Sequence, residues 1–231
     1  MAAQPRGFHG GVFPVGDELF SETFTEETQF EFCGRSLSIS QNYSANLGPA
    51  APVWASAVAL CRYFEEEKLC FLERKVIELG SGTGIVGILA ALLGGDVTLT
   101  DLPCALKQIQ DNVRANVPSS CGHQLKVCAL SWGQDQSHFP SDFDVILCAD
   151  IVYLPKTFPS LIQTLQHLSS HSTTIYFSSQ MREEHGTITF FEELLPLHFD
   201  CQLLRRDAEL NINLYRVSKK IHSLTERETE R

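Results

Sequence analysis

The sequence predicts an α/β fold in which a mostly parallel sheet carries helices on both faces. From residue 75 onward, short apolar runs alternate with longer segments whose apolar residues recur at helical spacing. Glycines or acidic residues directly follow several of the apolar runs, and ligands bind beyond the carboxyl ends of strands in such sheets. The length of 231 residues suits one large domain with an N-terminal lead-in.

The first expected elements are a hairpin and a helix. Residues 30–40 alternate between apolar and polar side chains around Gly34-Arg35, which predicts a β-hairpin with its turn there. Residues 53–66 have helical spacing, and the apolar face of the predicted helix holds Val53, Trp54, Ala57, Leu60, Cys61 and Phe64.

Strands and helices then alternate. The predicted strands cover residues 75–79, 96–100, 124–130, 143–148 and 173–178. The predicted helices cover residues 84–93, 103–116, 155–169 and 187–195. Pro103 suits the first turn of its helix, where an N–H group has no intrahelical partner. Residues 199–204 and 212–217 are expected to close the sheet as a pair of strands.

Both ends of the chain are expected to lie outside the domain. The glycine-rich start predicts a flexible N-terminus over residues 1–19. The domain, with its hairpin and first helix, is expected to cover residues 20–217. Residues 218–231 are polar and charged, which predicts a frayed tail.

Composition narrows the class of ligand. The net charge of −10 argues against nucleic acid, because phosphate binding needs clustered Lys and Arg. The charge suits a basic partner or a cationic substrate such as lysine, or serves solubility alone. No run approaches a transmembrane span, and residues 1–14 lack the regions of a secretory signal. Eight scattered cysteines without a Cys-x-x-Cys pair predict neither a zinc site nor a disulfide framework, and a reducing intracellular compartment follows.

The most informative segment is the glycine-rich stretch after the strand at residues 75–79. Residues 78–87 read ELGSGTGIVG. Glycines allow positive φ and let backbone N–H groups approach a ligand, so the stretch predicts a nucleotide-like cofactor. Residues 82–87 match the dinucleotide pattern G-x-G-x-x-G, and residues 78–84 match the acid-x-G-x-G-x-G pattern of S-adenosylmethionine-dependent methyltransferases.

The register of the glycines favours S-adenosylmethionine. A dinucleotide loop needs its first glycine directly after the strand, and Gly80 rather than Gly82 holds that place. S-adenosylmethionine carries an ammonium and a sulfonium, so the carboxylate of Glu78 suits it better than it suits a diphosphate. The alternative is a plain strand-to-helix turn in which Glu78 caps backbone N–H groups.

Two further strand ends carry side chains that suit an adenosine. Asp101 ends the second strand, where a carboxylate can accept both ribose hydroxyls. Its alternative role is to cap the helix predicted at residues 103–116, and the two roles can coexist. Trp132 follows the third strand and either forms a wall for the adenine or belongs to the core.

The fourth strand end carries the groups for a methyl acceptor, which must be neutral to attack a sulfonium. Asp150 ends this strand and Tyr153 follows it, facing the same crevice. Asp150 could orient the substrate ammonium and influence its deprotonation, while Tyr153 could orient the lone pair of the resulting amine. Asp150 could instead cap the next turn, with Tyr153 packed on the core.

Together these stretches resemble the seven-β-strand protein lysine methyltransferases of the methyltransferase-like group, which carry a D-x-x-Y motif. The resemblance rests on residues 78–84 (ELGSGTG), 99–101 (LTD), 130–133 (LSWG) and 149–153 (ADIVY). Within that family, three stretches point to the methyltransferases of eukaryotic elongation factor 1-alpha: residues 84–92 (GIVGILAAL), 100–103 (TDLP) and 181–187 (MREEHGT).

The resemblance implies a Rossmann-like, seven-stranded methyltransferase sheet with an antiparallel closing strand. It implies a metal-free acceptor channel at Asp150 and Tyr153, and it implies S-adenosylmethionine contacts at Trp54, Gly80, Ser81, Gly82, Asp101, Trp132 and Ala149. The implied reaction is direct transfer of a methyl group to a lysine of a protein, expected to be elongation factor 1-alpha. Neither nucleic acid nor membrane is an expected partner, and the chain is expected to be a monomer in the cytoplasm and also at the centrosome.

Two positions depart from the family pattern. Relatives have Asp where this chain has Ala55, and Gly where it has Cys148, which is expected to crowd the pocket floor. Three other functions stay open: a small-molecule methyltransferase, a non-catalytic cofactor-binding protein, which Ala55 suggests, and a nicotinamide oxidoreductase.

Overall fold

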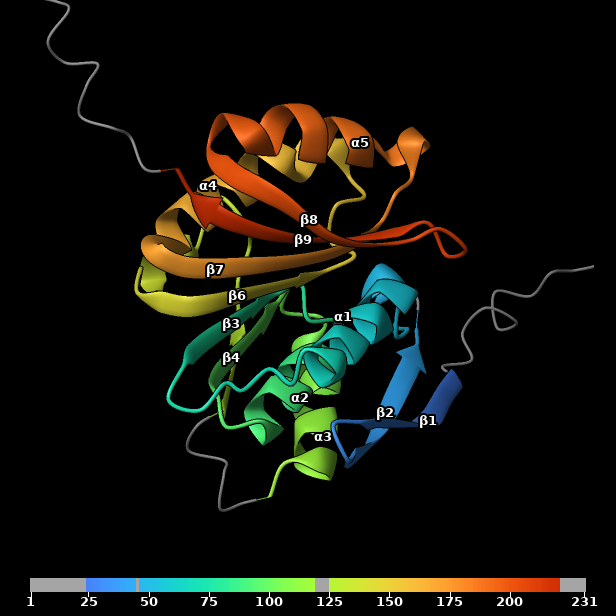
Figure 1. The fold of residues 1–231 in the computed structure, drawn as a ribbon. Helices are drawn as coiled ribbons and strands as arrows, with labels where there is room; N and C mark the ends of the chain where they lie inside the picture. The colour runs from blue at the N-terminus through green and yellow to red at the C-terminus, as the bar shows by residue number, and fades with distance from the viewer. Residues whose placement is uncertain (1–23, 45, 119–124, 221–231) are drawn as a thin grey trace, which may run out of the picture.

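The computed structural model describes residues 24–44, 46–118 and 125–220 (Figure 1). The strands are β1 (Phe24–Phe32), β2 (Arg35–Tyr43), β3 (Lys75–Leu79), β4 (Asp96–Asp101), β5 (Leu125–Ala129), β6 (Phe143–Ala149), β7 (Ser169–Gln180), β8 (Phe199–Asp207) and β9 (Ile212–Lys219). The helices are α1 (Ala55–Glu66), α2 (Ile85–Leu92), α3 (Leu106–Asn116), α4 (Phe158–Leu168) and α5 (Thr187–Thr189). The N-terminus predicted at residues 1–19 lies outside the described residues, as do residues 221–231 of the tail predicted from residue 218. Ser218 and Lys219, which were predicted to begin that tail, are the last residues of β9.

Seven strands form one sheet in the order β5-β4-β3-β6-β7-β9-β8. The strands from β5 to β7 are parallel, and β9 runs antiparallel to both β7 and β8. This confirms the predicted sheet and its antiparallel closing strand. The strand order changes direction between β3 and β6, and such a switch point opens a crevice at the carboxyl ends of the strands.

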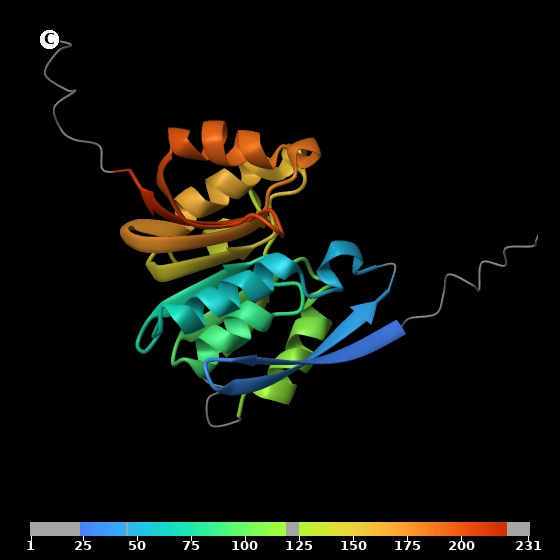
Figure 2. The same ribbon diagram turned by 45° about the vertical axis from the view of Figure 1, so that its right-hand side comes forward.

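Helices cover both faces of the sheet. Helices α1, α2 and α3 lie on one face, and α4 and the segment that begins with α5 lie on the other (Figures 1 and 2). Successive residues of a strand point to opposite faces, so neighbours enter different cores. Val76 belongs to the core under the first helix layer and Ile77 to the core under the second. The central strands β3 and β6 are buried on both faces, which explains their mostly apolar sequences.

One predicted turn and one predicted helix start differ from the structure. The hairpin turn lies at Cys33-Gly34 instead of Gly34-Arg35, with positive φ at both residues. The N–H group of Cys33 donates to Glu65 on α1 at 2.7 Å, a contact that no local pattern shows. Trp54 was wrongly expected on the apolar face of a helix. It precedes α1 with extended backbone and is 38% exposed.

Two predicted helices also differ. The helix predicted from residue 103 begins at Leu106, because residues 102–105 form a turn that the Ala105 N–H group closes on the Leu102 carbonyl at 3.0 Å. The helix predicted at residues 187–195 has regular α geometry only in α5. A π turn (Phe190–Leu194) and a 3₁₀ turn (Leu195–Leu197) follow, and Pro196 has no N–H group to continue a regular ladder.

The hairpin is held against the domain by three side-chain amides of α3. Gln108, Asn112 and Asn116 stand four residues apart, so they share one helix face. Their amide oxygens accept the β2 backbone N–H groups of Asn42, Ser40 and Ser38 at 2.7, 2.8 and 2.7 Å, respectively. These amides therefore satisfy the backbone N–H groups of β2 as a neighbouring strand would, and they cover an otherwise open sheet edge.

The same amides reach the glycine-rich loop. Asn112 Nδ2 donates to the Thr83 carbonyl at 2.9 Å and to the Ser40 carbonyl at 3.0 Å. Gln108 Nε2 lies 3.3 Å from the Gly82 carbonyl. The hairpin, α3 and the loop after β3 therefore form one hydrogen-bonded unit.

Replacing Asn112 by Leu should lower the free energy of unfolding by about 3 kcal/mol, because it leaves buried backbone groups of Ser40 and Thr83 without partners. Urea unfolding followed by circular dichroism measures the change. Arg114→Leu is the control, an exposed substitution on the same helix with an expected change below about 0.5 kcal/mol. Equal losses in the two variants would contradict the role of the amides.

In the described ranges, no helix combines the length and the apolar character needed to cross a membrane.

Candidate active site

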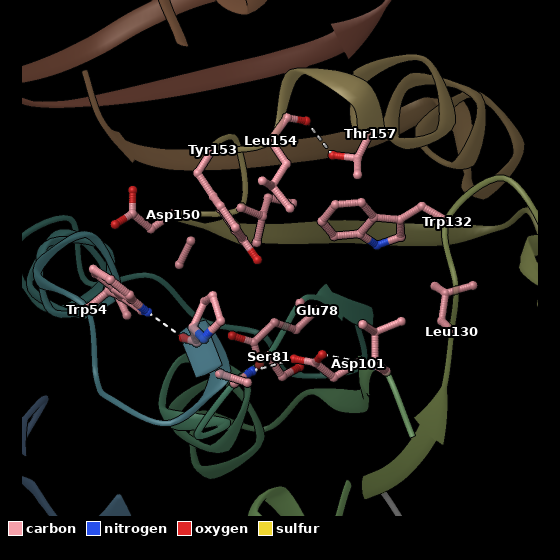
Figure 3. Close-up of a pocket in the computed structure, with 18 of the residues that line it drawn as sticks. Trp54, Glu78, Ser81, Asp101, Leu130, Trp132, Asp150, Tyr153, Leu154 and Thr157 are labelled. Atoms are coloured by element: carbon pink, nitrogen blue, oxygen red, sulfur yellow. Dashed lines mark hydrogen bonds between the residues drawn. The ribbon is translucent and has the colours of Figure 1, made fainter. Parts of the chain in front are cut away.

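A pocket of about 420 Å³ lies at the carboxyl ends of β3, β4 and β6, beside the switch point (Figure 3). The volume falls within the range of small-molecule sites. All nine predicted site residues line the pocket: Trp54, Gly80, Ser81, Gly82, Asp101, Trp132, Ala149, Asp150 and Tyr153. The fold therefore brings together residues from five separate segments of the sequence: the residue before α1, the loop after β3, the end of β4, the segment after β5, and the end of β6 with its following loop.

The loop after β3 makes the floor of the pocket. Gly80 and Gly82 have φ of +62° and +56°. A Cβ atom on Gly80 would lie 2.7 Å from Cγ2 of Ile151, so only glycine fits there. Backbone and side chain of Ser81 hold the loop to β4, with the Ser81 N–H group 2.9 Å from the Thr100 carbonyl and Ser81 Oγ 3.1 Å from the Thr100 nitrogen.

Gly87 has a packing role. A Cβ atom there would lie 2.1 Å from Cδ2 of Leu99 and 2.7 Å from Oε2 of Glu78. Gly87 does not line the pocket. The dinucleotide-like spacing from Gly82 to Gly87 therefore reflects the close packing of α2 on the sheet.

Glu78 is a buried acid that faces the pocket, with only 2% of its surface exposed. Burial raises its pKa to about 8, although hydrogen bonds from Ser81 and from the Gly87 N–H group (3.1 Å) oppose the shift. In the described part of the chain, no Lys, Arg or His forms an ion pair with it. A cationic ligand in this pocket would supply the missing charge partner.

The stability of the ligand-free protein should depend on Glu78. Its folded pKa of about 8 lies above the ordinary value of 4.5, so its proton stabilises the fold fully below about pH 4.5, and this contribution is lost as pH rises through about 8. Glu78→Gln should therefore gain stability relative to the wild type from about pH 5 to about pH 9. Urea unfolding at several pH values measures this, and parallel curves for the two proteins would refute it.

Asp101 connects β4 to the loop. Its Oδ2 accepts the Gly82 N–H group at 2.8 Å and its Oδ1 accepts the Leu102 N–H group at 2.7 Å. Burial raises the pKa of this carboxyl, and the two backbone hydrogen bonds oppose the shift. Because α3 begins at Leu106, the alternative that Asp101 caps that helix is wrong.

The two tryptophans lie on opposite sides of the pocket (Figure 3). Trp54 Nε1 donates to the Pro49 carbonyl at 2.7 Å, which fixes the ring at the rim. Trp132 is half-buried and packs against the second core while it lines the pocket, so the interpretation as a core residue holds in part.

The two residues that depart from the family pattern do not line the pocket. Cys148 points into the second core and is not a lining residue, so the expectation that it crowds the pocket floor is wrong. Ala55 is the first residue of α1 and is exposed outside the pocket lining.

Asp150 follows β6 in the left-handed region, with φ of +54°. Its carboxylate faces the end of β7, where it accepts the Gln180 N–H group at 3.1 Å and both Nη atoms of Arg182 at 3.2 Å each. The alternative that Asp150 caps the next turn is therefore wrong. Its side chain is 2% exposed, and Asp150 is one of the residues that line the pocket.

Tyr153 points its hydroxyl into the middle of the pocket (Figure 3). Burial raises the pKa of this phenol, and the charges of Asp101 and Asp150 raise it further. The hydroxyl therefore stays protonated at neutral pH and can donate or accept a hydrogen bond.

Sequence reasoning missed Arg182. Its guanidinium forms the ion pair with Asp150 and lies 5.5 Å from the centre of the Trp54 ring. The stretch that contains it, residues 181–187, supported the family resemblance, but no role could be assigned from its spacing.

Comparisons with known proteins agree with this geometry. A family model described as lysine methyltransferase matches residues 32–196. EEF1A lysine methyltransferase 3 of Xenopus tropicalis is 60% identical over 87% of this chain and 89% of its own, and the Mus musculus protein of that name is 58% identical over 89% and 88%. Protein N-lysine methyltransferase METTL21A of Xenopus tropicalis is 42% identical over 81% of this chain and 85% of its own.

Solved structures with the same fold are more distant in sequence. The T. Thermophilus 16S rRNA methyltransferase RsmC, in complex with AdoMet and guanosine, has a TM-score of 0.58 at 14% identity and covers 85% of this chain and 51% of its own. Magnesium protoporphyrin IX methyltransferase from Synechocystis, with bound SAH, has a TM-score of 0.52 at 12% identity and covers 71% of this chain and 82% of its own. These two structures establish the likeness of fold.

Proposed function

Because this chain belongs to the lysine methyltransferase family, we propose that it methylates the ε-amine of a lysine in elongation factor 1-alpha, with S-adenosylmethionine as methyl donor. The observation that carries the proposal is the pocket at the switch point, which gathers a glycine loop, three acidic residues, two tryptophans and a tyrosine. S-adenosylmethionine supplies an electrophilic methyl group on a sulfonium.

The residues of the pocket fit this cofactor. The buried carboxyl of Glu78, which has no cation beside it among the described residues, suits the ammonium group. Gly80, Ser81 and Gly82 bring backbone close to the methionine end, and no Cβ fits at Gly80. Asp101 would accept the ribose hydroxyls with the lone pairs that its two backbone hydrogen bonds leave free.

Three further contacts complete the proposed cofactor site. Trp132 would form one wall for the adenine, and Trp54 would close the opposite rim. Ala149, with its small side chain, would let the cofactor approach the end of β6 closely. The two aromatic walls would exclude water from the reacting groups, which strengthens the electrostatic interactions inside the pocket.

Asp150 and Tyr153 would form the acceptor side. An amine attacks only in its neutral form, and most of the catalytic gain then comes from holding it in line with the methyl group. The Tyr153 hydroxyl, which points into the pocket, would orient the lone pair of the amine. Asp150, which also lines the pocket, would attract the arriving ammonium.

Elongation factor 1-alpha is the substrate in the names of the relatives at 58–60% identity, which match the chain over nearly all its length. The net charge of −10 suits a basic segment around the target lysine. A small-molecule methyltransferase would need the same cofactor-binding residues, but it would not need a surface that binds a basic segment of a protein substrate.

Transfer of labelled methyl groups tests the proposal. Purified protein and labelled S-adenosylmethionine are added to a lysate that lacks the endogenous enzyme, and mass spectrometry identifies the labelled band and the modified residue. Label on a lysine of elongation factor 1-alpha supports the proposal, and label confined to a metabolite would favour the small-molecule reaction. Calorimetry separates the remaining cases: S-adenosylmethionine binding without any label indicates a non-catalytic protein, and NAD binding without S-adenosylmethionine binding would overturn the cofactor assignment.

The family resemblance also leads us to propose a monomer that acts in the cytoplasm and at the centrosome, with no nucleic acid or membrane partner. Sedimentation equilibrium tests the monomer. Fluorescence imaging of the tagged protein beside a centrosome marker tests the location, and a membrane or nuclear distribution would contradict it.

A further inference from the structure

Arg182 stands behind the wall of the pocket and contacts two residues that form it. Its Nη1 lies 3.2 Å from Oδ1 of Asp150 and its Nη2 lies 3.2 Å from Oδ2, so the planar fork meets the carboxylate with two parallel bonds. The guanidinium also lies over the Trp54 ring, and Gln180 Oε1 accepts from Nη2. Arg182 itself is not a lining residue.

The pair is shielded from solvent. The side chain of Asp150 is 2% exposed and that of Arg182 is 18% exposed. Charges in such a place interact strongly, because solvent screens them little. A carboxylate there without a partner would be costly, and the Asp150–Arg182 pair carries no net charge.

The balance of charge matters because the acceptor must lose a proton. An unbalanced carboxylate beside a lysine favours the ammonium form, whereas a nearby cation disfavours that form. Other charged or titratable groups surround the acceptor side of the pocket and the turn after Arg182: Glu78, Asp101, Tyr153, Lys156, Glu183, Glu184 and His185. Within the described ranges, none of these seven residues forms an ion pair with Asp150 or Arg182.

We propose that Arg182 is a positioning residue that balances the charge of Asp150, so that the acceptor lysine can be guided into the pocket by Asp150 and still react as a neutral amine. The proposal rests on the proposed function. It assigns the Asp150–Arg182 pair two tasks: the fork and the Trp54 contact hold the acceptor side rigid, and the guanidinium prevents Asp150 from trapping the substrate as an ammonium ion.

The pH dependence of methyl transfer tests the inference. Arg182→Met and Arg182→Gln remove the charge, and the Gln variant keeps a hydrogen-bond donor for Asp150 in case the Met variant folds poorly. Arg182→Lys keeps the charge but loses the fork and its stacking on Trp54. Arg205→Met is the matched control, because Arg205 also pairs with a carboxylate, that of Glu66, and also lies over a ring, that of Tyr63 at 6.0 Å, outside the pocket lining.

For both neutral variants we expect the acid limb of kcat to move about one pH unit upward, with about tenfold less activity at neutral pH and recovery at alkaline pH. Arg182→Lys should keep the wild-type acid limb, and Arg205→Met should keep both profile and rate. Calorimetry with S-adenosylmethionine and thermal unfolding check that each variant is folded and binds cofactor. A loss that is equal at every pH, or no loss, would overturn the inference. Should the wild-type protein label no lysine at any pH, the proposed function fails first, and the inference falls with it.

Discussion

Replacing Asp150 by Asn is expected to lower kcat for methyl transfer by about a hundredfold or more, while the affinity for S-adenosylmethionine stays close to wild type. The variant should keep the fold with a lower free energy of unfolding, because a shielded ion pair is broken. The variant loses the negative charge that would guide the lysine, and it leaves Arg182 beside the acceptor side without its partner. Asn is the sharpest replacement, because it tolerates the φ of +54° at this position and keeps an oxygen to accept the Gln180 N–H group.

Initial rates with elongation factor 1-alpha and saturating S-adenosylmethionine measure this effect, and calorimetry measures cofactor affinity in parallel. Asp142→Asn is the control, since it removes the same charge from an exposed ion pair with Lys75. If Asp150→Asn kept kcat within about threefold of wild type, the assignment of Asp150 to the acceptor side would be wrong.

Replacing Asp101 by Asn is expected to weaken S-adenosylmethionine binding by about a hundredfold, or roughly 2.8 kcal/mol. The carboxylate accepts N–H groups of Gly82 and Leu102 with separate oxygens, and an amide has only one oxygen to offer. The loop after β3 would therefore lose its tie to β4, and the cofactor would lose the charged acceptor proposed for its ribose.

Calorimetry with S-adenosylmethionine measures the loss of affinity, and thermal unfolding without cofactor separates it from a general loss of stability. Asp111→Asn serves as control, because its exposed carboxylate pairs with Lys107 and Arg114 on α3. An unchanged Kd together with a lower Tm would mean that Asp101 only holds the loop.

Much of the fold could be predicted because its signals are local. The strand at residues 75–79 was predicted at its observed bounds, because a short, mostly apolar run that ends at a glycine is typical of a strand in a buried parallel sheet. The errors lie where a distant contact decides. Glu65 receives the Cys33 N–H group and thereby stabilises the turn one residue away from the predicted place. The edge of β2 is satisfied by amides of α3, which lies more than sixty residues further along the chain.

In the candidate site, too, some features follow from local sequence signals and others from distant contacts. By itself the sequence determined the ends of the parallel strands, and with them the glycine loop and the positions of Asp101, Trp132, Asp150 and Tyr153, because parallel strands bring their carboxyl ends to one edge of a sheet. Only the tertiary structure decided which side chains meet there. The ion pair of Asp150 and Arg182, and the cation–π contact of Arg182 with Trp54, join segments that share no periodicity. Pairing across elements depends on register and side-chain direction in three dimensions, so the charge balance at the acceptor side appears only in the folded chain.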